Sequence, residues 1–316
     1  MFDRLQDDAG IDVALENLLK ALGDGGYRFV TPTPATHRLV AARRSEAAPG
    51  DLRDVFGWRR PFREADLDAN LWRLLAQAGA LEAVDEGRVR SRVRVSSLDD
   101  RLYLHSASGS GPDEVFLGPD SYRFARLLRT AAKDVPRRGR FMDVGTGAGV
   151  GALTLAGMHP GAEVVAGDVN PGALRLVRIN ARAAGLRVQA ALGPGLTAVQ
   201  GDFDLIVANP PYIAGSGGRT YRDGGDDLGT RLALEWMREA VDRLRPGGRI
   251  VLYTGSPIVD GRDSVQDAMA ELAGRIGGTL AYEELDPDVF GGTLKREAYA
   301  EVERIAAIGA VLQAPS

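Results

Sequence analysis

The chain has 316 residues, of which 44% are hydrophobic and 26% charged, so it can build one or two ordinary globular domains and is not a disordered polymer. Its formal net charge of -4 argues against a protein held to nucleic acid or to a membrane surface by long-range attraction. It has no cysteine and only three scattered histidines, which excludes disulfides, a thiol nucleophile and a histidine or thiolate metal site. No signal core and no apolar run of about 18 residues occurs, so we expect a cytoplasmic protein without a membrane partner.

The first third of the chain favours helices followed by a pair of strands. Residues 11–22 carry apolar side chains at helical spacing, and residues 64–79 repeat that pattern. Residues 88–106 are typical of two short strands around a turn at residues 98–100. This order predicts a small, mainly helical, winged-helix-like domain over residues 1–110, which we expect to recognise the substrate.

Four arginines alternate along the first of these expected strands: Arg88, Arg90, Arg92 and Arg94. Alternate residues of one strand share a face, so all four are expected on the same side. Such a strip could grip phosphates, but the N-terminal residues are nearly balanced in charge. A solvated face held by ion pairs is therefore the favoured interpretation, and nucleic acid is a possible but not a favoured partner.

From residue 111 to residue 316, apolar strands alternate with helices, which predicts an α/β domain around a parallel sheet. The strands are expected at 141–145, 163–169, 203–210 and 248–255, and the helices at 149–158, 171–184, 229–244 and 263–275. The segments 279–286 and 296–309 are expected to close the sheet as an antiparallel edge.

A glycine-rich turn follows the first of these strands. It runs from Asp143 through Gly145, Thr146 and Gly147 to Gly149 and opens a helix. Glycine lets the backbone bend sharply and approach a ligand closely, and the helix start presents unpaired N–H groups to it. The same letters also fit a dinucleotide fingerprint, so the turn alone does not separate the two kinds of ligand.

An acidic residue, Asp168, ends the next strand and is followed by Val169 and Asn170. A carboxylate in that place can accept both hydroxyls of a ribose lying over the glycine turn. Asn170 is better suited to cap the following helix, which leaves Asp168 for the ligand. The turn and the acid together predict a nucleoside cofactor without saying which one.

The segment Asn209-Pro210-Pro211-Tyr212 follows a third strand and resembles the NPPY motif of amino-group methyltransferases. Two prolines cannot continue a strand ladder and fix a rigid protruding turn. The resemblance implies S-adenosylmethionine as the cofactor. It also implies that the Asn209 amide and the Pro210 carbonyl orient the target nitrogen, with Pro211 shaping the turn and Tyr212 stacking on the acceptor.

The region from about 115 to 255 is similar to the protein-glutamine N5-methyltransferase (HemK/PrmC) family, which modifies release factors. The resemblance implies a Rossmann-like class I methyltransferase fold with a mostly parallel seven-stranded sheet. The cofactor contacts that it implies are Asp143, Gly145, Thr146, Gly147, Gly149, Asp168, Val169 and Asn209.

Two segments depart from that family. Gly118-Pro119-Asp120-Ser121-Tyr122 stands where the family has Arg-Pro-Glu-Thr-Glu, and Pro194 stands about where it has an adenine-contacting aspartate. Backbone groups or Leu196 would then have to contact the adenine. A protein such as a release factor or a small molecule is the expected acceptor partner, and adenine of nucleic acid or the nitrogen or ring carbon of a natural product stays open.

Substrate contacts are expected from Tyr122 and from the polar loop that holds Tyr221 and Arg222. Residues 286–290 could form a further wall of the site, although a turn at the sheet edge is the favoured interpretation. Two other classes stay in view. A DNA-binding cofactor sensor would not need the NPPY asparagine, and an NAD-linked oxidoreductase would leave that motif unexplained. The sequence does not indicate the oligomeric state.

Overall fold

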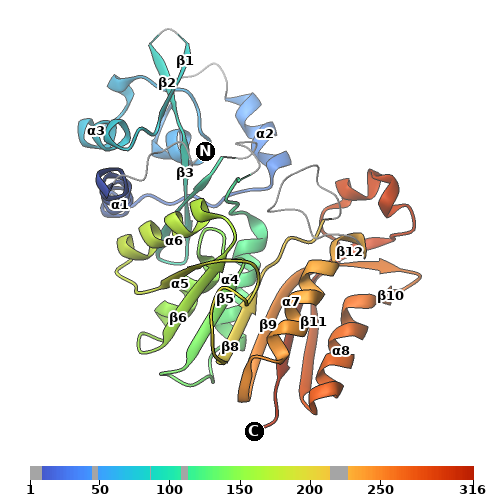
Figure 1. The fold of residues 1–316 in the computed structure, drawn as a ribbon. Coiled ribbons are helices and arrows are strands. Elements are labelled where there is room, and N and C mark those ends of the chain that lie inside the picture. The colour runs from blue at the N-terminus through green and yellow to red at the C-terminus, as the bar shows by residue number, and fades with distance from the viewer. Residues whose placement is uncertain (1–8, 45–48, 86, 108–112, 214–226) are drawn as a thin grey trace.

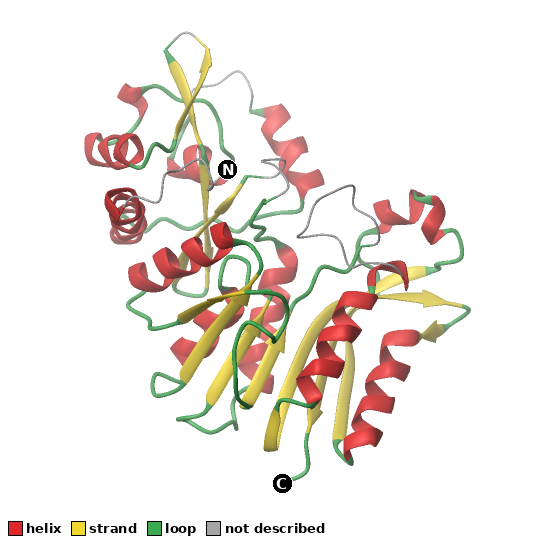
Figure 2. Ribbon diagram, in the orientation of Figure 1, coloured by secondary structure: helices red, strands yellow, loops and turns green. Residues whose placement is uncertain are grey.

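The computed structural model describes residues 9–44, 49–85, 87–107, 113–213 and 227–316. A part made of helices and hairpins, coloured blue to cyan, lies beside a larger α/β part (Figure 1). In the larger part helices flank one twisted sheet (Figure 2). Among the described residues, no helix has the length and apolarity needed to cross a membrane.

The N-terminal part combines three α-helices with two hairpins. They are α1 (Ala9–Asp24), α2 (Pro34–Arg43), α3 (Ala69–Gln77), β1 (Leu81–Asp85), β2 (Arg88–Ser91), β3 (Val93–Leu98) and β4 (Arg101–Ser106). The expected helix over 64–79 is shorter, because Asp68 caps α3 by accepting hydrogen bonds from the Asn70 and Leu71 amides. The expected turn at 98–100 is confirmed, since Leu98 pairs with Arg101 in the β3–β4 hairpin.

The arginine strip expected on one strand is wrong. Arg88 and Arg90 lie on β2, which pairs with β1, whereas Arg94 lies on β3, which pairs with β4. Arg92 lies between the two strands and belongs to neither. Its Nε donates to the Leu81 carbonyl at 3.1 Å. Arg94 is buried, with 6% of its surface exposed. The four side chains therefore do not form one solvated face.

The α/β part is built on a sheet whose strands run in the order β11-β12-β9-β8-β5-β6-β7. Strands β5 to β9 are parallel, while β12 is antiparallel to both β9 and β11. The bounds are β5 (Arg140–Val144), β6 (Glu163–Asp168), β7 (Gln189–Leu192), β8 (Phe203–Ala208), β9 (Leu244–Val259), β10 (Arg262–Asp263, a short pair with β9), β11 (Thr279–Asp286) and β12 (Arg304–Gln313). This is the Rossmann-like sheet with an antiparallel edge that the sequence predicts.

Helices cover both faces of the sheet because successive strand residues point to opposite sides. Phe141, Leu205 and Val251 face one core, and their neighbours Met142, Ile206 and Ile250 face the other. The first core holds α4 (Pro119–Ala131), α5 (Val150–Met158) and α6 (Pro171–Ala183), and the second holds α7 (Arg231–Val241) and α8 (Ser264–Ile276).

The sheet topology places the ligand crevice. The chain passes from β5 to β6 on one side and returns to β8 on the other, so β5 is flanked by both. At such a reversal the loops at the carboxyl ends of the strands diverge and leave a crevice. The glycine turn follows β5, Val169 follows β6, and Asn209 follows β8. The reversal therefore brings these three segments together at one edge of the sheet.

The N-terminal part packs on α6 through α1. Asp12 accepts from Arg175 Nε at 2.6 Å, and both side chains are largely buried. Asn180 of α6 makes a second connection, since its amide oxygen accepts from the Leu104 amide at 2.9 Å and its nitrogen donates to the Leu104 carbonyl at 3.1 Å. The same nitrogen donates to the Ala148 carbonyl in the glycine turn at 3.0 Å, so one side chain connects β4 to the site.

Candidate cofactor and methyl-acceptor site

The glycine turn after β5 adopts backbone angles that favour glycine. Gly145, Gly147 and Gly149 have φ values of +67°, +55° and +88°. A side chain at Gly145 would collide with Trp236, since its Cβ would lie 2.6 Å from the indole. At Gly147, in contrast, a Cβ would meet no atom within 4 Å. The backbone at Gly147 therefore borders open space where a ligand can lie against it.

Asp143 holds this turn from inside. Its carboxylate accepts from Thr146 Oγ1 at 2.5 Å and from the Ala152 amide at 2.8 Å, and its side chain is buried. Burial raises the pKa of Asp143 to about 7, although these two hydrogen bonds act in the opposite direction. Asp143 lines the cavity, but its bonds indicate that it supports the turn from behind.

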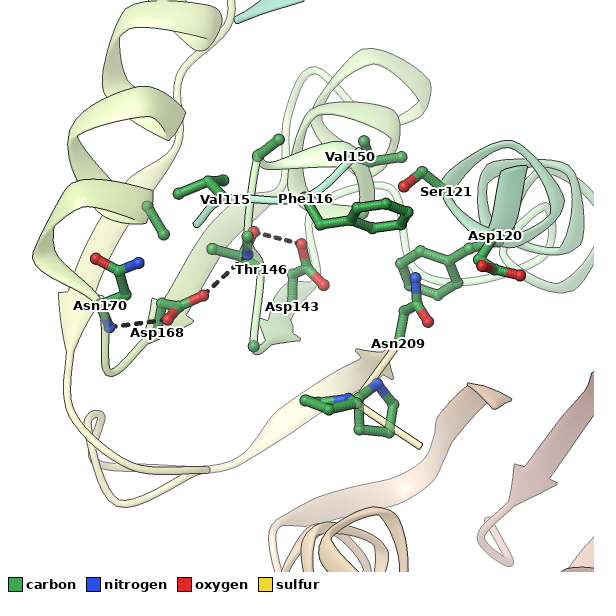
Figure 3. Close-up of a pocket in the computed structure, with 18 of the residues that line it drawn as sticks. Val115, Phe116, Asp120, Ser121, Asp143, Thr146, Val150, Asp168, Asn170 and Asn209 are labelled. Atoms are coloured by element: carbon green, nitrogen blue, oxygen red, sulfur yellow. Dashed lines mark hydrogen bonds between the residues drawn. The ribbon is translucent and has the colours of Figure 1, made fainter. Parts of the chain in front are cut away.

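Asp168 faces the turn from the end of β6, as Figure 3 shows. Its Oδ2 accepts from the Gly147 amide at 2.9 Å and its Oδ1 accepts from the Asn170 amide at 2.9 Å. Burial raises the pKa of Asp168, and the two N–H donors oppose that shift. Asn170 caps α6 by accepting from the Gly172 amide, as expected, which leaves the Asp168 carboxylate beside the cavity.

One cavity brings most of the expected site residues together. It is lined by seven of the eight residues expected to contact the cofactor, namely Asp143, Gly145, Thr146, Gly147, Asp168, the half-exposed Val169 and Asn209, and also by Pro210, Pro211 and Tyr212. Asn209 lies across the cavity from Asp168 in Figure 3. Asp168 is thus near one end and the Asn209 amide near the other.

Tyr212 is packed more tightly than its expected stacking role requires. Its ring lies edge-on to Phe290 at a centroid distance of 5.5 Å, and a Cβ on Gly255 would lie 2.4 Å from it. Burial, together with the neighbouring Asp120, raises the pKa of Tyr212, so its phenol stays protonated. Stacking of Tyr212 on an acceptor remains a prediction.

Asp120 is a buried acid that lines this cavity. Its Oδ1 accepts from the Tyr253 hydroxyl at 2.7 Å and is paired with Arg123 Nη1 at 3.3 Å. Arg123 in turn bonds Asp286 at 2.8 Å. Asp120 belongs to the segment that departs from the resembled family, and this network was not predicted from the sequence.

Several other lining residues were not identified from the sequence. Phe116 and Trp236 line the cavity, and Trp236 also lies within 3.4 Å of the position that a Cβ on Gly195 would take. Gly193 and Gly195, on either side of Pro194, line the cavity where an adenine contact was expected. Leu196, the other expected adenine contact, does not line the cavity, because its side chain is buried in the core with α7.

Three further expectations need correction or lie outside the description. Gly149 does not line the cavity, and a Cβ there would press on Leu153 and Val177, so glycine at this position permits close packing of α5 and α6; its contact with a cofactor stays a prediction. Tyr122 does not line the cavity either, because its hydroxyl accepts from the Thr31 amide at 3.0 Å in the N-terminal part. Tyr221 and Arg222 lie outside the described residues.

The segment 286–290 contributes a wall, contrary to the favoured interpretation of a plain edge turn, because Phe290 lines the cavity. The described residues do not bring three histidine, aspartate or glutamate side chains together into a metal-binding group. What the cavity offers is an apolar cleft with a carboxylate, a glycine turn and an amide.

Comparison with known proteins agrees with this geometry. Residues 124–259 match the methyltransferase small domain family. The chain is 36% identical over 192 residues to the release factor glutamine methyltransferase of Deinococcus radiodurans, covering 56% of this chain and 63% of that protein. It is 29% identical over 190 residues to the ribosomal RNA small subunit methyltransferase C of Pseudomonas entomophila, covering 57% of this chain and 54% of that protein.

The fold also agrees with a solved structure, Trm5b from Pyrococcus abyssi, with a TM-score of 0.50, 15% identity, and coverage of 92% of this chain and 80% of that chain. At that identity the likeness shows the fold alone. The chain spans less than two thirds of the length of the curated relatives it matches.

Proposed function

We propose that this chain, whose residues 124–259 match the methyltransferase small domain, transfers a methyl group from S-adenosylmethionine to a planar amide or amine nitrogen. The observation that carries the proposal is the convergence of three strand ends on one cavity. Asp168 lies next to the glycine turn, and Asn209 and Pro210 line the same cavity. An NAD-linked reaction would leave the asparagine and prolines without a role.

The residues present fit the adenosyl group. The open space over Gly147 admits a ligand against the backbone, and the carboxylate of Asp168 can accept the hydroxyls of a ribose. Gly193, Gly195 and Trp236 line the cavity with backbone and an aromatic side chain suited to a flat base. When bound, the cofactor would supply a methyl group already activated by its sulfonium.

The protein's part in the reaction is to position the acceptor. The Asn209 amide oxygen and the Pro210 carbonyl would accept hydrogen bonds from the acceptor NH₂ group and so direct the nitrogen lone pair at the methyl carbon. The cofactor would supply the methyl group and keep the sulfur as its leaving group, while Asn209 and Pro210 would hold the acceptor nitrogen in line and the methylated nitrogen would release a proton to solvent. Orientation and exclusion of water would account for most of the rate, because no strong base is required.

By resemblance, we propose a glutamine side chain of a release factor as the first acceptor to test. The experiment is transfer of labelled methyl groups from S-adenosylmethionine to purified release factor. We expect incorporation into the Gly-Gly-Gln segment. Incorporation into RNA or into a small amine instead would contradict the glutamine assignment, while no incorporation into any of these acceptors would contradict the proposed activity.

Asn209→Ala should lower turnover by roughly 100- to 1,000-fold, the range found when one preorganised hydrogen-bonding group is removed from an active site. Cofactor affinity should change little, because Asp168 and the glycine turn remain. Asn70→Ala, on the exposed surface of α3, is the matched control and should behave like the wild type. Equal losses of turnover and cofactor affinity in Asn209→Ala would instead give Asn209 a structural role.

A further inference from the structure

A second, larger hollow adjoins the catalytic cavity. This groove has a volume of about 1200 Å³ and lies between the N-terminal part and the loops of the α/β part. Phe116, Asp120 and Phe290 line both hollows, so the two are adjacent. Helix α2, which has no buried residue, presents Pro34, His37 and Arg38 to the groove.

The two walls of the groove carry opposite charge. The described residues of the N-terminal wall include six arginines and one acid: Arg38, Arg59, Arg60, Arg88, Arg90, Arg94 and Asp85. The facing wall has Arg123 with Glu114, Asp120, Asp286 and Asp288. An anionic group entering the groove would be attracted to the N-terminal wall and repelled by the other.

Three of the six arginines are neutralised by carboxylates. Arg60 pairs with Asp54 at 2.8 Å, Arg59 with Glu82 at 2.5 Å, and Arg88 with Asp85 at 2.5 Å. Arg90 and Arg94 have no such partner among the described residues. In this they differ from Arg59, Arg60 and Arg88, each of which forms an ion pair.

Both of these arginines contain buried donors that are unsatisfied. Arg94 donates from Nε to the Gly57 carbonyl at 2.9 Å, but its Nη2 is buried without a hydrogen-bond partner in the described structure. Arg90 Nε is likewise buried and unpartnered. A buried donor on a charged group that lacks a partner is unfavourable, and both side chains line the groove where an anion could supply that partner.

The electrostatics of the cluster point the same way. Burial lowers the pKa of Arg94 to about 10, and the nearby Arg59 acts in the same direction. Burial also lowers the pKa of Arg59, with Arg90 adding to that shift and Glu82 opposing it. The pKa of His37 is lowered by burial and by Arg94. Burial is the main cause of all three shifts, and a neighbouring arginine adds to each of them.

We propose that this wall is an oxyanion subsite, centred on Arg90 and Arg94 with Arg38 at its rim, which holds a phosphate or carboxylate group of the methyl acceptor. Guanidinium groups recognise both kinds of oxyanion through paired N–H donors. The acceptor would extend from this wall past Phe116 and Asp120 to Asn209. That the anion belongs to the acceptor rests on the proposed function, whereas anion binding itself does not.

The test is calorimetric titration of the full chain with inorganic phosphate and, separately, with succinate at equal ionic strength. We expect millimolar or tighter binding of at least one anion, weakened at least about tenfold by Arg90→Gln. Arg38→Gln, on the exposed face of α2, should weaken binding to a smaller extent and does not disturb the core. Arg73→Gln is the matched control, because Arg73 is an exposed arginine of the same part that bonds Asn70 and Gln77.

Preference for phosphate would assign a phosphorylated group of the acceptor, and preference for succinate would assign a carboxylate. Binding of neither anion, or equal weakening by Arg73→Gln and Arg90→Gln, would overturn the subsite. S-adenosylmethionine titrations of the same variants separate the two proposals. Intact cofactor binding with no anion binding refutes only the subsite, and anion binding without cofactor binding refutes only the proposed function.

Discussion

Asp168 and Asn209 line one cavity from the ends of β6 and β8, and they are expected to affect different steps. Asp168 is held by the Gly147 and Asn170 amides, both at 2.9 Å, so its carboxylate is already oriented before a ligand binds. Asn209 lies at the opposite end of the cavity in Figure 3. This separation is consistent with the proposed roles, cofactor binding for Asp168 and acceptor positioning for Asn209.

Asp168→Ala should therefore weaken S-adenosylmethionine binding by roughly 10- to 100-fold, because hydrogen bonds to a charged partner contribute about 1.5–3 kcal/mol. Calorimetry on the purified variant measures this directly. Asp100→Ala, at a fully exposed hairpin turn, is the matched control. Cofactor affinity unchanged in Asp168→Ala would refute the ribose contact.

Asp143 should make folding stability depend on pH. Its folded-state pKa of about 7 lies above its ordinary value of 3.8, so the folded protein binds the proton more tightly than the unfolded chain. The contribution is fully present below about pH 4 and is lost as pH rises toward and through 7. Thermal unfolding across this range should show that loss in the wild type and a flatter profile in Asp143→Asn. Identical pH profiles would contradict this assignment.

At the scale of elements, the strand ends bring distant motifs together. Asp143 pairs with Val207 and Val144 with Gly167, so the glycine turn lies between the residues that follow β6 and β8. Asn180 of α6 then connects that turn to β4 of the N-terminal part. The position of the site thus depends on helix α6 as well as on the sheet.

Asn180→Ala should lower the free energy of unfolding by about 3 kcal/mol, because the Leu104 amide and the Leu104 and Ala148 carbonyls lose buried partners. Chemical denaturation measures the change. Cofactor affinity should also fall, since Ala148 belongs to the glycine turn that is proposed to bind the cofactor. Destabilisation no greater than in the exposed Asn70→Ala variant would show that water replaces the lost bonds.

The sequence predicted those elements whose periodicity is strong and missed those with weak patterns. Buried parallel strands such as β6 and β8 contain short apolar runs, VVA and LIVA, and α6 is clearly amphipathic. Helix α2 has no buried residue and β7 spans only Gln189–Leu192, so neither has a core-facing pattern. The closing strand β12 begins at Arg304, because residues 291–299 form short 3₁₀ turns instead.

The site was predictable to the same extent. The motifs at the strand ends predicted that Asp168 and Asn209 lie in the site, and both line the cavity. These motifs can be read locally, because the turns that follow a strand depend on nearby glycines and prolines. Trp236 and Phe290 reach the cavity from α7 and from the turn after β11, and only tertiary packing brings them there. The prediction of an arginine strip was wrong for a related reason. Strand β2 ends before Arg92, so Arg94 lies in a different hairpin and in a buried environment.

At the scale of the whole molecule, the N-terminal part and the α/β part together line a groove that adjoins the cavity. The groove and the cavity share Phe116, Asp120 and Phe290, and the Asp12–Arg175 pair holds α1 on α6. The net charge of -4 is compatible with a local cationic wall, because the facing wall is acidic. Binding at this wall would therefore be selective for a ligand with one anionic end, in contrast to a long polyanion.

The most direct test of the central claim is calorimetric titration of the full chain with S-adenosylmethionine, S-adenosylhomocysteine and NAD. We predict binding of both adenosyl compounds in the micromolar range, loss of affinity in Asp168→Ala, and no binding of NAD. Binding of NAD without binding of either adenosyl compound would contradict the account. The glycine turn would then serve a dinucleotide, and Asn209 would have no methyl donor to face.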